Sequence, residues 1–371
     1  MALNIRNGTM VAAVLHGAGD VRLEEVPIPR LGPEDVLAKV EAASLDFTDR
    51  KVYLRGYHPM IEIPGLFGHE WAGVVVTAGT RADPRWRPGM RVVAANSAPC
   101  NEADRSARCR PCQRGRLSMC ERLVYNNGAF APYIRIPGRI ASVNLIELPP
   151  DTPFEEAALA EPLACVMHAI RRVPICSGEL VAILGAGPIG LMFVSALRAR
   201  YGQTVRILSL DHHDDRLVLA EALGADVVFN TRSGLGPDQV KEVLGLERPD
   251  VVVEAVGSEQ AHREAFDLLA RGGILVSFGG VARGTVLPLD LHRLHYEEVQ
   301  IVPIYHHTPT DFAGAVRAIV SREVPVGPLI TARLPLSELQ MALEMVQERT
   351  TLRSILLPQK EGGQRVMESC S

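Results

Sequence analysis

The stretch Val181–Gly190, with the sequence VAILGAGPIG, decides how the second half of the chain folds. Its four leading apolar residues predict a buried strand, and the apolar run after Pro188 predicts a helix. The GxGxxG pattern between them is typical of a phosphate-binding turn. Gly185 permits the tight turn, Gly187 lets the backbone approach a pyrophosphate, and Gly190 lets the helix pack closely on the strand. The free N–H groups at the helix N-terminus then favour phosphate binding.

An acidic residue follows the next predicted strand. Asp211 lies 21 residues after Gly190. A carboxylate there binds the hydroxyls of an adenosine ribose and repels a 2′-phosphate, which favours NAD over NADP. Protonation of His212 or His213 would weaken this preference. A glycine-rich turn without a ligand is the alternative, but the strand, helix and acidic residue together favour a cofactor. The residues expected to bind it are Gly185, Gly187, Pro188, Ile189, Gly190, Asp211 and Arg216.

Apolar strands alternate with helices on both sides of this stretch, which predicts an α/β fold with a doubly wound parallel sheet. The other predicted strands are Thr204–Leu210, Val227–Asn230, Val251–Glu254, Ile274–Phe278 and Val299–Ile304. The predicted helices are Pro153–Val173, Pro188–Arg200, Arg216–Leu223, Glu259–Leu269, Thr310–Ser321 and Leu336–Gln347, followed by a polar tail at Glu361–Ser371. The first 150 residues instead show short β-type runs separated by Gly, Pro and Asp.

Composition excludes several classes of protein. The 371 residues are 47% hydrophobic and 22% charged, which excludes a largely disordered, collagen-like or coiled-coil chain. A net charge of −4 gives no broad positive field, so we expect neither a nucleic-acid nor a membrane partner. The uncharged run Leu180–Leu197 contains three glycines and a proline, which fits a strand, turn and helix better than a membrane span. Without a signal-peptide pattern at the N-terminus, we expect a cytoplasmic protein.

Four of the seven cysteines lie within 21 residues, at Cys100, Cys109, Cys112 and Cys120. Four thiolates can enclose one Zn²⁺ tetrahedrally and leave no position for a substrate, so this spacing predicts a structural zinc site. Two disulfides or four unrelated thiols are the alternatives, and a reducing compartment disfavours the disulfides. Cys165 and Cys176 are interpreted as small core residues. Cys370 falls in the tail.

Four motifs, in one order, carry a resemblance to a known family. They are Gly68-His69-Glu70, the cysteine cluster, Glu161-Pro162-Leu163 and GAGPIG. From about Met10 to Pro358 the chain resembles the zinc-containing medium-chain alcohol and polyol dehydrogenases, with the sorbitol, threonine and sugar branches most similar. The resemblance implies a GroES-like β-barrel catalytic domain at 1–157 and 306–371, with the zinc lobe at 96–122. It also implies a Rossmann NAD-binding domain at 158–305, and a homodimer or homotetramer.

The same resemblance assigns candidate residues for a catalytic zinc site. His69, Glu70 and Glu161 match zinc-site positions of the family, whereas Asp46 stands where a cysteine is usual. A carboxylate is an acceptable zinc ligand and carries the same charge as a thiolate, so we expect Asp46, His69, Glu70 and Glu161 to form a metal site. The alternative is a lost site in which Asp46 is merely solvated. Thr48 matches the residue that passes the substrate proton outward, and Asp49 is expected to orient His69.

The implied activity is oxidation of an alcohol with hydride transfer to a nicotinamide cofactor. Zinc would lower the pKa of the substrate hydroxyl, and the cofactor would accept the hydride. We therefore expect an NAD-dependent zinc dehydrogenase acting on a secondary alcohol, polyol or sugar. A zinc-independent, NADPH-linked reductase of the same superfamily and a non-catalytic nucleotide-binding scaffold are the alternatives. The pair His306-His307 follows a predicted strand, where a place near the active site and an ordinary turn both remain open.

Overall fold

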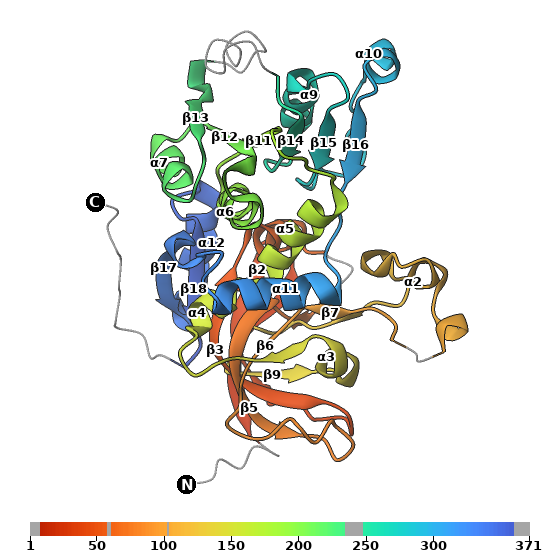
Figure 1. Ribbon diagram of the computed structural model, residues 1–371. Coiled ribbons are helices and arrows are strands. Elements are labelled where there is room, and N and C mark those ends of the chain that lie inside the picture. Colours follow the sequence, from red (N-terminus) through yellow and green to blue (C-terminus); the bar gives the residue numbers. More distant parts are fainter. Residues whose placement is uncertain (1–7, 58–60, 102–103, 234–247, 360–371) are drawn as a thin grey trace. The chain divides into compact units, whose positions relative to one another are not determined.

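The computed structural model describes residues 8–57, 61–101, 104–233 and 248–359. The predicted tail and Cys370 lie outside these residues, as do residues 1–7. The described residues form two compact units. The first comprises Met1–Ala164, His307–Arg322 and Val326–Ser371, and the second comprises Cys165–His306 and Glu323–Pro325. This division into compact units does not test the domain boundaries expected near residues 157 and 306, which stay a prediction. The chain enters the second unit and then returns to the first (Figure 1).

The second unit is built on a six-stranded sheet in which every strand pair is parallel. Its spatial order is β13 (Val227–Asn230), β12 (Arg206–Asp211), β11 (Leu180–Leu184), β14 (Val251–Glu254), β15 (Ile274–Ser277) and β16 (Gln300–Pro303). This is the order of a Rossmann fold, which reverses direction beside its first strand. Strand β11 coincides with the apolar half of the GxGxxG stretch, so the motif lies where nucleotides bind in such sheets.

Helices connect the strands of this sheet, as the alternating pattern predicts. They are α6 (Pro188–Tyr201), α7 (Asp214–Ala222), α9 (Glu259–Leu268) and α10 (Leu291–Tyr296). Apolar side chains of β11, β12 and β14 form a buried core with those of α9, including Ala261, Ala265 and Phe266. The sheet is buried by such packing, which explains why its strands are almost uninterrupted apolar runs.

The first unit is rich in antiparallel strands. Its largest sheet has the order β10 (Leu145–Glu147), β6 (Arg91–Ala94), β5 (Glu70–Ala78), β3 (Val36–Leu45), β18 (Arg353–Leu357) and β17 (Ile330–Pro335), with β9 (Tyr133–Ile136) also paired to β3. Two smaller sheets consist of β2 (Asp20–Pro27), β1 (Thr9–Gly17) and β4 (Gly65–Leu66), and of β7 (Ser97–Ala98) and β8 (Val124–Tyr125). Its helices are α1 (Phe47–Arg55), α2 (Arg110–Gln113), α3 (Gly138–Val143), α4 (Phe154–Ala157), α11 (Pro309–Val320) and α12 (Leu339–Glu348), together with the start of α5 (Ala160–Arg172).

The C-terminal part of the chain completes this large sheet. Strand β18 pairs antiparallel with β3, with Ser354 opposite Leu45 and Ile355 opposite Ser44. Figure 1 shows the consequence, because the blue strands β17 and β18 belong to the same sheet as the red and orange strands β3 and β5. A segment more than 300 residues along the chain is therefore an integral part of the first unit.

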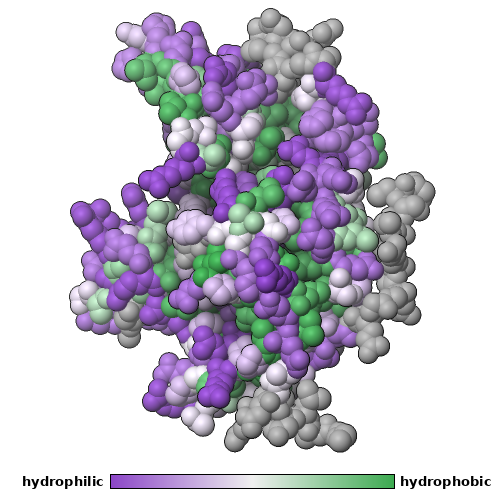
Figure 2. Space-filling view, turned by 180° about the vertical axis from the view of Figure 1, so that it is seen from behind, coloured by the Kyte–Doolittle hydropathy of each residue, from purple (hydrophilic) through white to green (hydrophobic). Residues whose placement is uncertain are grey.

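Two expectations about local structure are wrong. The single helix predicted at Pro153–Val173 is two helices, α4 and α5, separated at Ala158 and Leu159. The N–H of Ala158 bonds to the carbonyls of both Phe154 and Glu156, which tightens and ends the first helix. Cys176 is exposed and Cys165 is only partly buried, so neither is a core residue. Among the described residues no helix is long and apolar enough to cross a membrane. Figure 2 shows hydrophilic side chains spread over the visible face, with hydrophobic ones between them.

Candidate functional site

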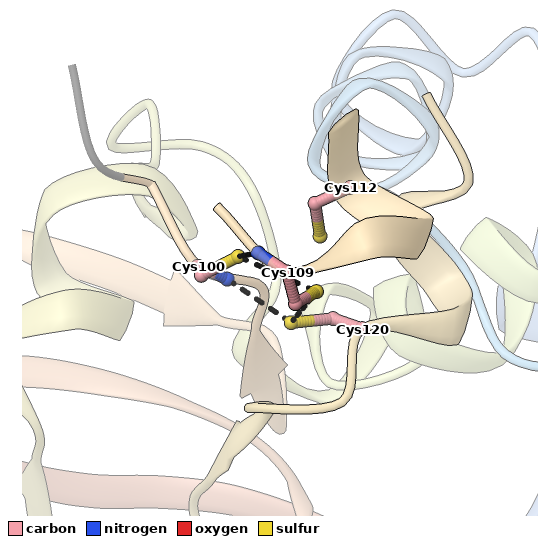
Figure 3. Close-up of side chains that lie close together, drawn as sticks. All are labelled: Cys100, Cys109, Cys112 and Cys120. Carbon is pink, nitrogen blue, oxygen red and sulfur yellow. Dashed lines mark hydrogen bonds between the residues drawn. The ribbon is translucent and has the colours of Figure 1, made fainter. Parts of the chain in front are cut away.

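The four clustered cysteines come together as a compact group of thiols (Figure 3). The Sγ atom of Cys109 lies 3.7 Å from that of Cys100 and 3.7 Å from that of Cys120. Four sulfurs bound about 2.3 Å from one zinc ion would be roughly 3.8 Å apart at the edges of the tetrahedron. All four side chains are buried and none forms a disulfide. The sulfur positions therefore fit a four-thiolate zinc site, and no disulfide joins these four cysteines.

Backbone N–H groups donate to several of these sulfurs. The N–H of Cys109 points to the sulfur of Cys100, and those of Cys100 and Arg122 point to the sulfur of Cys120. Burial raises the pKa of the Cys109 thiol, but backbone N–H donors at Cys112 and Glu121 outweigh burial and lower that pKa to about 6. A thiolate is the form that binds metal, so the backbone favours metal binding at Cys109, whereas burial raises the pKa of the Cys112 and Cys120 thiols.

Gly68 explains why the Gly-His-Glu motif needs its glycine. Its φ of +92° is in the region that side chains rarely adopt, and a Cβ would lie 2.6 Å from the ring of Phe130. That ring packs edge-on against Phe67, with 5.3 Å between the ring centroids. The close approach fixes the backbone that carries His69, which is itself buried.

His69 is oriented by Asp49, as the sequence predicts. The Nδ1 atom of His69 lies 3.0 Å from Oδ1 of Asp49, and both side chains are buried. This bond leaves Nε2 as the ring nitrogen that can bind a metal, which is the usual arrangement of metal-binding histidines. Asp49 belongs to the first turn of α1, and its carboxylate also accepts a bond from the N–H of Asp46. The start of α1 therefore holds the imidazole in place.

Asp46 is the N-cap of α1 and is only partly buried. Its Oδ1 accepts the N–H of Asp49 at 2.7 Å, which completes a capping box with the reciprocal bond from the N–H of Asp46 to the Asp49 carboxylate. The hydroxyl of Thr48 also bonds to the Asp46 carboxylate. The residue at the cysteine position of the family thus has a structural role in addition to any role as a metal ligand.

Glu70 is completely buried and pairs with an arginine that the sequence patterns do not predict. Nη1 of Arg353 lies 2.9 Å and 3.1 Å from the two carboxylate oxygens of Glu70. Arg353 is at the start of β18 and is also buried, because β18 returns to the sheet next to β3. The one local signal for this residue is an arginine inside the apolar run 352–357, where a charge needs a buried partner.

Glu161, in the first turn of α5, is close to two histidines of the first unit. Donor atoms of His69, Glu70 and Glu161 lie within 4.8 Å of one another, and those of Asp46, Asp49 and His69 form a second such group. His69 belongs to both groups. Among the described residues, no such group of donor atoms contains both Asp46 and Glu161. Nε2 of His307 lies 3.6 Å from Oε1 of Glu161.

This cluster buries more negative charge than its cations balance. Four carboxylates, one guanidinium and one imidazole belong to it: Asp46, Asp49, Glu70, Glu161, Arg353 and His69. Burial raises the pKa of Glu70 to about 8 although Arg353 opposes the shift, and Asp46 raises it further. Burial likewise raises the pKa of Asp49 to about 6. A divalent cation would relieve this repulsion, so the oxygen and nitrogen donors present fit a bound metal.

The glycine-rich turn in the second unit has the geometry that its motif predicts. Gly185 has a φ of +101°, and a Cβ on Gly190 would lie 1.8 Å from the carbonyl oxygen of Gly185. A Cβ on Gly187 would meet nothing within 4 Å, so the backbone is open there. Pro188 and Ile189 form the first turn of α6, for which Gly187 is the N-cap without a side-chain cap. These features fit a phosphate group at the start of the helix.

Asp211 is the last residue of β12 and is buried beside this turn. Its Oδ2 accepts the N–H of Ala186 at 2.6 Å, while Oδ1 accepts the N–H groups of His212 and His213 and contacts Nδ1 of His213 at 2.8 Å. The bonds to Oδ1 fill its capacity to accept hydrogen bonds. Oδ2 can accept one further hydrogen bond, for example from a ribose hydroxyl. Arg216, in the first turn of α7, is near enough to help lower the pKa of Asp211.

Known protein families match parts of both units. A family model described as "Alcohol dehydrogenase GroES-like domain" matches residues 32–149, and one described as "Zinc-binding dehydrogenase" matches residues 188–321. Sorbitol dehydrogenase of Bombyx mori is 33% identical over 353 residues, covering 93% of this chain and 97% of the relative. Erythritol/L-threitol dehydrogenase of Mycolicibacterium smegmatis is 31% identical, covering 94% and 98%.

Solved structures extend this similarity to the fold. An alcohol dehydrogenase from Thermotoga maritima matches with a TM-score of 0.84 at 25% identity, covering 95% of this chain and 100% of that one. A protein from Sinorhizobium meliloti 1021, solved with NADP bound, matches with a TM-score of 0.84 at 26% identity and the same coverage. Fold, motifs and relatives agree, and the chain belongs to the zinc-containing medium-chain alcohol and polyol dehydrogenase family.

Proposed function

We propose that this protein transfers hydride between a secondary alcohol, polyol or sugar and NAD, at a zinc site in its first unit. The observation that carries the proposal is the buried group of His69, Glu70 and Glu161, whose donor atoms lie within 4.8 Å of one another. The bond from the His69 ring to the Asp49 carboxylate and the excess of buried carboxylates support metal binding there. A lost site would have no reason to retain this costly burial of charge.

Asp46, His69, Glu70 and Glu161 are the residues that we propose for the catalytic metal site. A zinc ion held by them would act as a Lewis acid that lowers the pKa of the substrate hydroxyl. Thr48 contacts Asp46 through its hydroxyl, and we propose that it accepts the substrate proton and passes it on. Asp49 keeps the imidazole of His69 oriented, and Arg353 keeps the Glu70 carboxylate fixed. The cysteine cluster would hold a second zinc with a structural role.

The substrate class comes from the relatives. Their names include sorbitol, erythritol or threitol, and xylulose, all of which are polyols or sugars. We therefore propose a polyol or sugar with adjacent hydroxyl groups. The carboxylate of Asp46 is a harder donor than the thiolate usual in the family, so the metal would be a somewhat stronger Lewis acid.

The proposed cofactor is NAD. Asp211 is negatively charged beside the glycine-rich turn and would repel the 2′-phosphate of NADP. We also propose a cytoplasmic location, because the buried cysteine cluster needs reduced thiols. A homodimer or homotetramer is expected from the family, and β16 is the edge strand of its sheet, with Ile301 exposed. Light scattering on the purified protein would decide between these states.

Metal content and a substrate panel test the proposal together. The full-length protein should contain two zinc ions per chain by elemental analysis, and should oxidise at least one member of a panel of polyols, sugars and amino alcohols with NAD. Loss of activity after chelation, with recovery on adding zinc, would support the assignment. One zinc per chain, together with NADPH-dependent reduction of an activated double bond, would favour the reductase. One zinc and no turnover would favour a non-catalytic scaffold.

A further inference from the structure

His307 is a buried histidine at the edge of the proposed metal site. Its side chain is 1% exposed, and its Nε2 atom lies 3.6 Å from Oε1 of Glu161. His307 is also the first residue of the segment that returns to the first unit. It directly precedes Thr308, the N-cap of α11, so the start of that helix positions it.

The position of His307 is well fixed. Thr308 and Asp311 form a capping box, in which the carboxylate of Asp311 bonds to both the N–H and the hydroxyl of Thr308. The His307 ring stacks on Phe312, with 5.8 Å between ring centroids and 29° between the planes. These contacts hold the imidazole next to Glu161, as is required of a metal-binding side chain.

The distance between His307 and Glu161 fits shared ligation. A separation of 3.6 Å is too long for a good N–H···O hydrogen bond. Two donor atoms bound to one zinc at about 2.1 Å in a tetrahedral arrangement lie roughly 3.4 Å apart. The two donor atoms therefore already have nearly the spacing that a common metal ion would impose.

The other candidate donors are partly engaged elsewhere. Both oxygens of Glu70 accept bonds from Arg353. The Asp46 carboxylate caps α1 and accepts the Thr48 hydroxyl. A site that depended on these two residues would have to break or share those bonds. A neutral imidazole next to Glu161 supplies a donor without adding negative charge to an already acidic cluster.

We propose that His307 binds the zinc in this site together with His69 and Glu161, while Asp46 stays at the start of α1 and Glu70 stays paired with Arg353. The inference rests on the proposed function. One carboxylate and two neutral imidazoles are three protein ligands. They leave the fourth position of a tetrahedral zinc for a substrate hydroxyl. Since Asp46 does not share a donor group with Glu161, His307 takes over part of the role of the missing thiolate.

Metal affinity of the full-length protein tests this assignment without measuring activity. His307→Ala should bind the catalytic-site zinc at least about 100-fold more weakly in competition with a chromophoric chelator, the upper end of the loss seen for outer-shell partners. It should retain the zinc of the cysteine cluster. Substitution with Co²⁺ should give a visible spectrum that differs between wild type and variant, because one nitrogen donor is lost. His307→Phe preserves packing on Phe312 and should behave like the alanine variant.

A matched control and a rescue sharpen the test. His292→Ala removes an exposed histidine of α10 and should change neither zinc affinity nor the Co²⁺ spectrum. Asp46→Cys restores the thiolate of the family, so the double variant Asp46→Cys/His307→Ala should regain tight binding of the second zinc. Wild-type zinc affinity and an unchanged Co²⁺ spectrum in both His307 variants would overturn the inference alone. A wild-type protein with only one zinc would overturn the proposed function as well.

Discussion

Arg353 donates from Nη1 to both carboxylate oxygens of Glu70, across 283 residues of chain. Both side chains are almost completely buried, at 3% and 0% exposure. The pair forms because β18 lies beside β3, and β3 lies beside β5, the strand that begins at Glu70. The C-terminal strand therefore supplies a cation that opposes the rise in the pKa of Glu70 within the proposed metal site.

Removing Arg353 should destabilise the first unit strongly. Arg353→Met leaves the Glu70 carboxylate buried without a cation, which typically costs about 3–5 kcal/mol. The measurement is denaturant unfolding at neutral pH. Arg353→Met/Glu70→Gln should recover part of the loss, since the uncompensated charge is gone. As a control, Arg22→Met breaks the exposed pair with Asp20 and should change stability by less than about 1 kcal/mol. Equal effects of the two arginine substitutions would contradict this account.

Asp49→Asn should weaken zinc binding at the catalytic site. The amide cannot polarise the imidazole of His69 as a carboxylate does, and losses of such partners typically reduce metal affinity about 10–100-fold. Chelator competition measures the effect, and the zinc of the cysteine cluster serves as an internal reference. Asp83→Asn changes an exposed carboxylate paired with Arg85 and should have no effect. An Asp49→Asn protein with wild-type zinc affinity would show that Asp49 does not orient the ligand.

Cys112→Ser should remove one zinc per chain and lower the melting temperature. Loss of one thiolate of four breaks a tetrahedral site that closes the loop between Cys100 and Cys120. Elemental analysis and thermal melting measure the two effects. Cys176→Ser replaces an exposed thiol outside the cluster and should leave both quantities unchanged. If Cys112→Ser retained two zinc ions, the cysteine cluster would not be a zinc site.

Two glycines of the nucleotide turn should differ sharply when replaced by alanine. In Gly190→Ala the new Cβ meets the carbonyl oxygen of Gly185, so the second unit should lose stability by about 1–3 kcal/mol, as is typical of overpacking. In Gly187→Ala the new Cβ points into open space, so folding should be normal. Binding of NAD should nevertheless weaken, because the methyl group blocks the approach of a phosphate. Melting curves and NAD titrations separate the two effects, and equal destabilisation by both changes would refute the assignment.

The contribution of Asp211 to stability should depend on pH in acid. Burial raises the pKa of Asp211, but bonds from His213 and from the N–H of Ala186 outweigh burial and lower it below the ordinary value of 3.8. A carboxyl whose pKa is lower in the folded state stabilises the fold above its unfolded pKa, and loses this effect as pH falls through the folded pKa. The stability difference between wild type and Asp211→Asn should thus shrink as pH falls below about pH 4. A constant difference down to pH 3 would contradict the lowered pKa.

Asp211→Asn also tests the choice of cofactor. Removal of the negative charge should weaken NAD binding and relatively strengthen NADP binding, as fluorescence titrations with each cofactor would show. Asp214→Asn removes an exposed carboxylate three residues away and serves as the control. Unchanged preference in Asp211→Asn would mean that the neighbouring histidines, rather than Asp211, decide which cofactor binds.

Local patterns were sufficient for much of this protein. The strand, turn and helix at Val181–Gly190 can be predicted because the three glycines have local structural roles within ten residues. The first has a positive φ, the second leaves the backbone open, and the third allows close packing. The cysteine cluster is equally local, since its four sulfurs come from one loop. The contact between His69 and Asp49 follows from a family motif rather than from spacing. The apolar pattern does not change at Ala158, so it does not predict the break between α4 and α5.

Only the tertiary structure revealed the environment of Glu70. Ser44 of β3 is opposite both Glu70 of β5 and Ile355 of β18, so the registers of three strands bring Arg353 to Glu70. A shift of one residue would turn Arg353 to the other face of the sheet, because side chains alternate along a strand. In the same way, His307 meets Glu161 only because the chain returns to the first unit. Sequence alone determines motifs whose atoms are neighbours along the chain, whereas contacts between distant segments depend on strand register, which no single segment encodes.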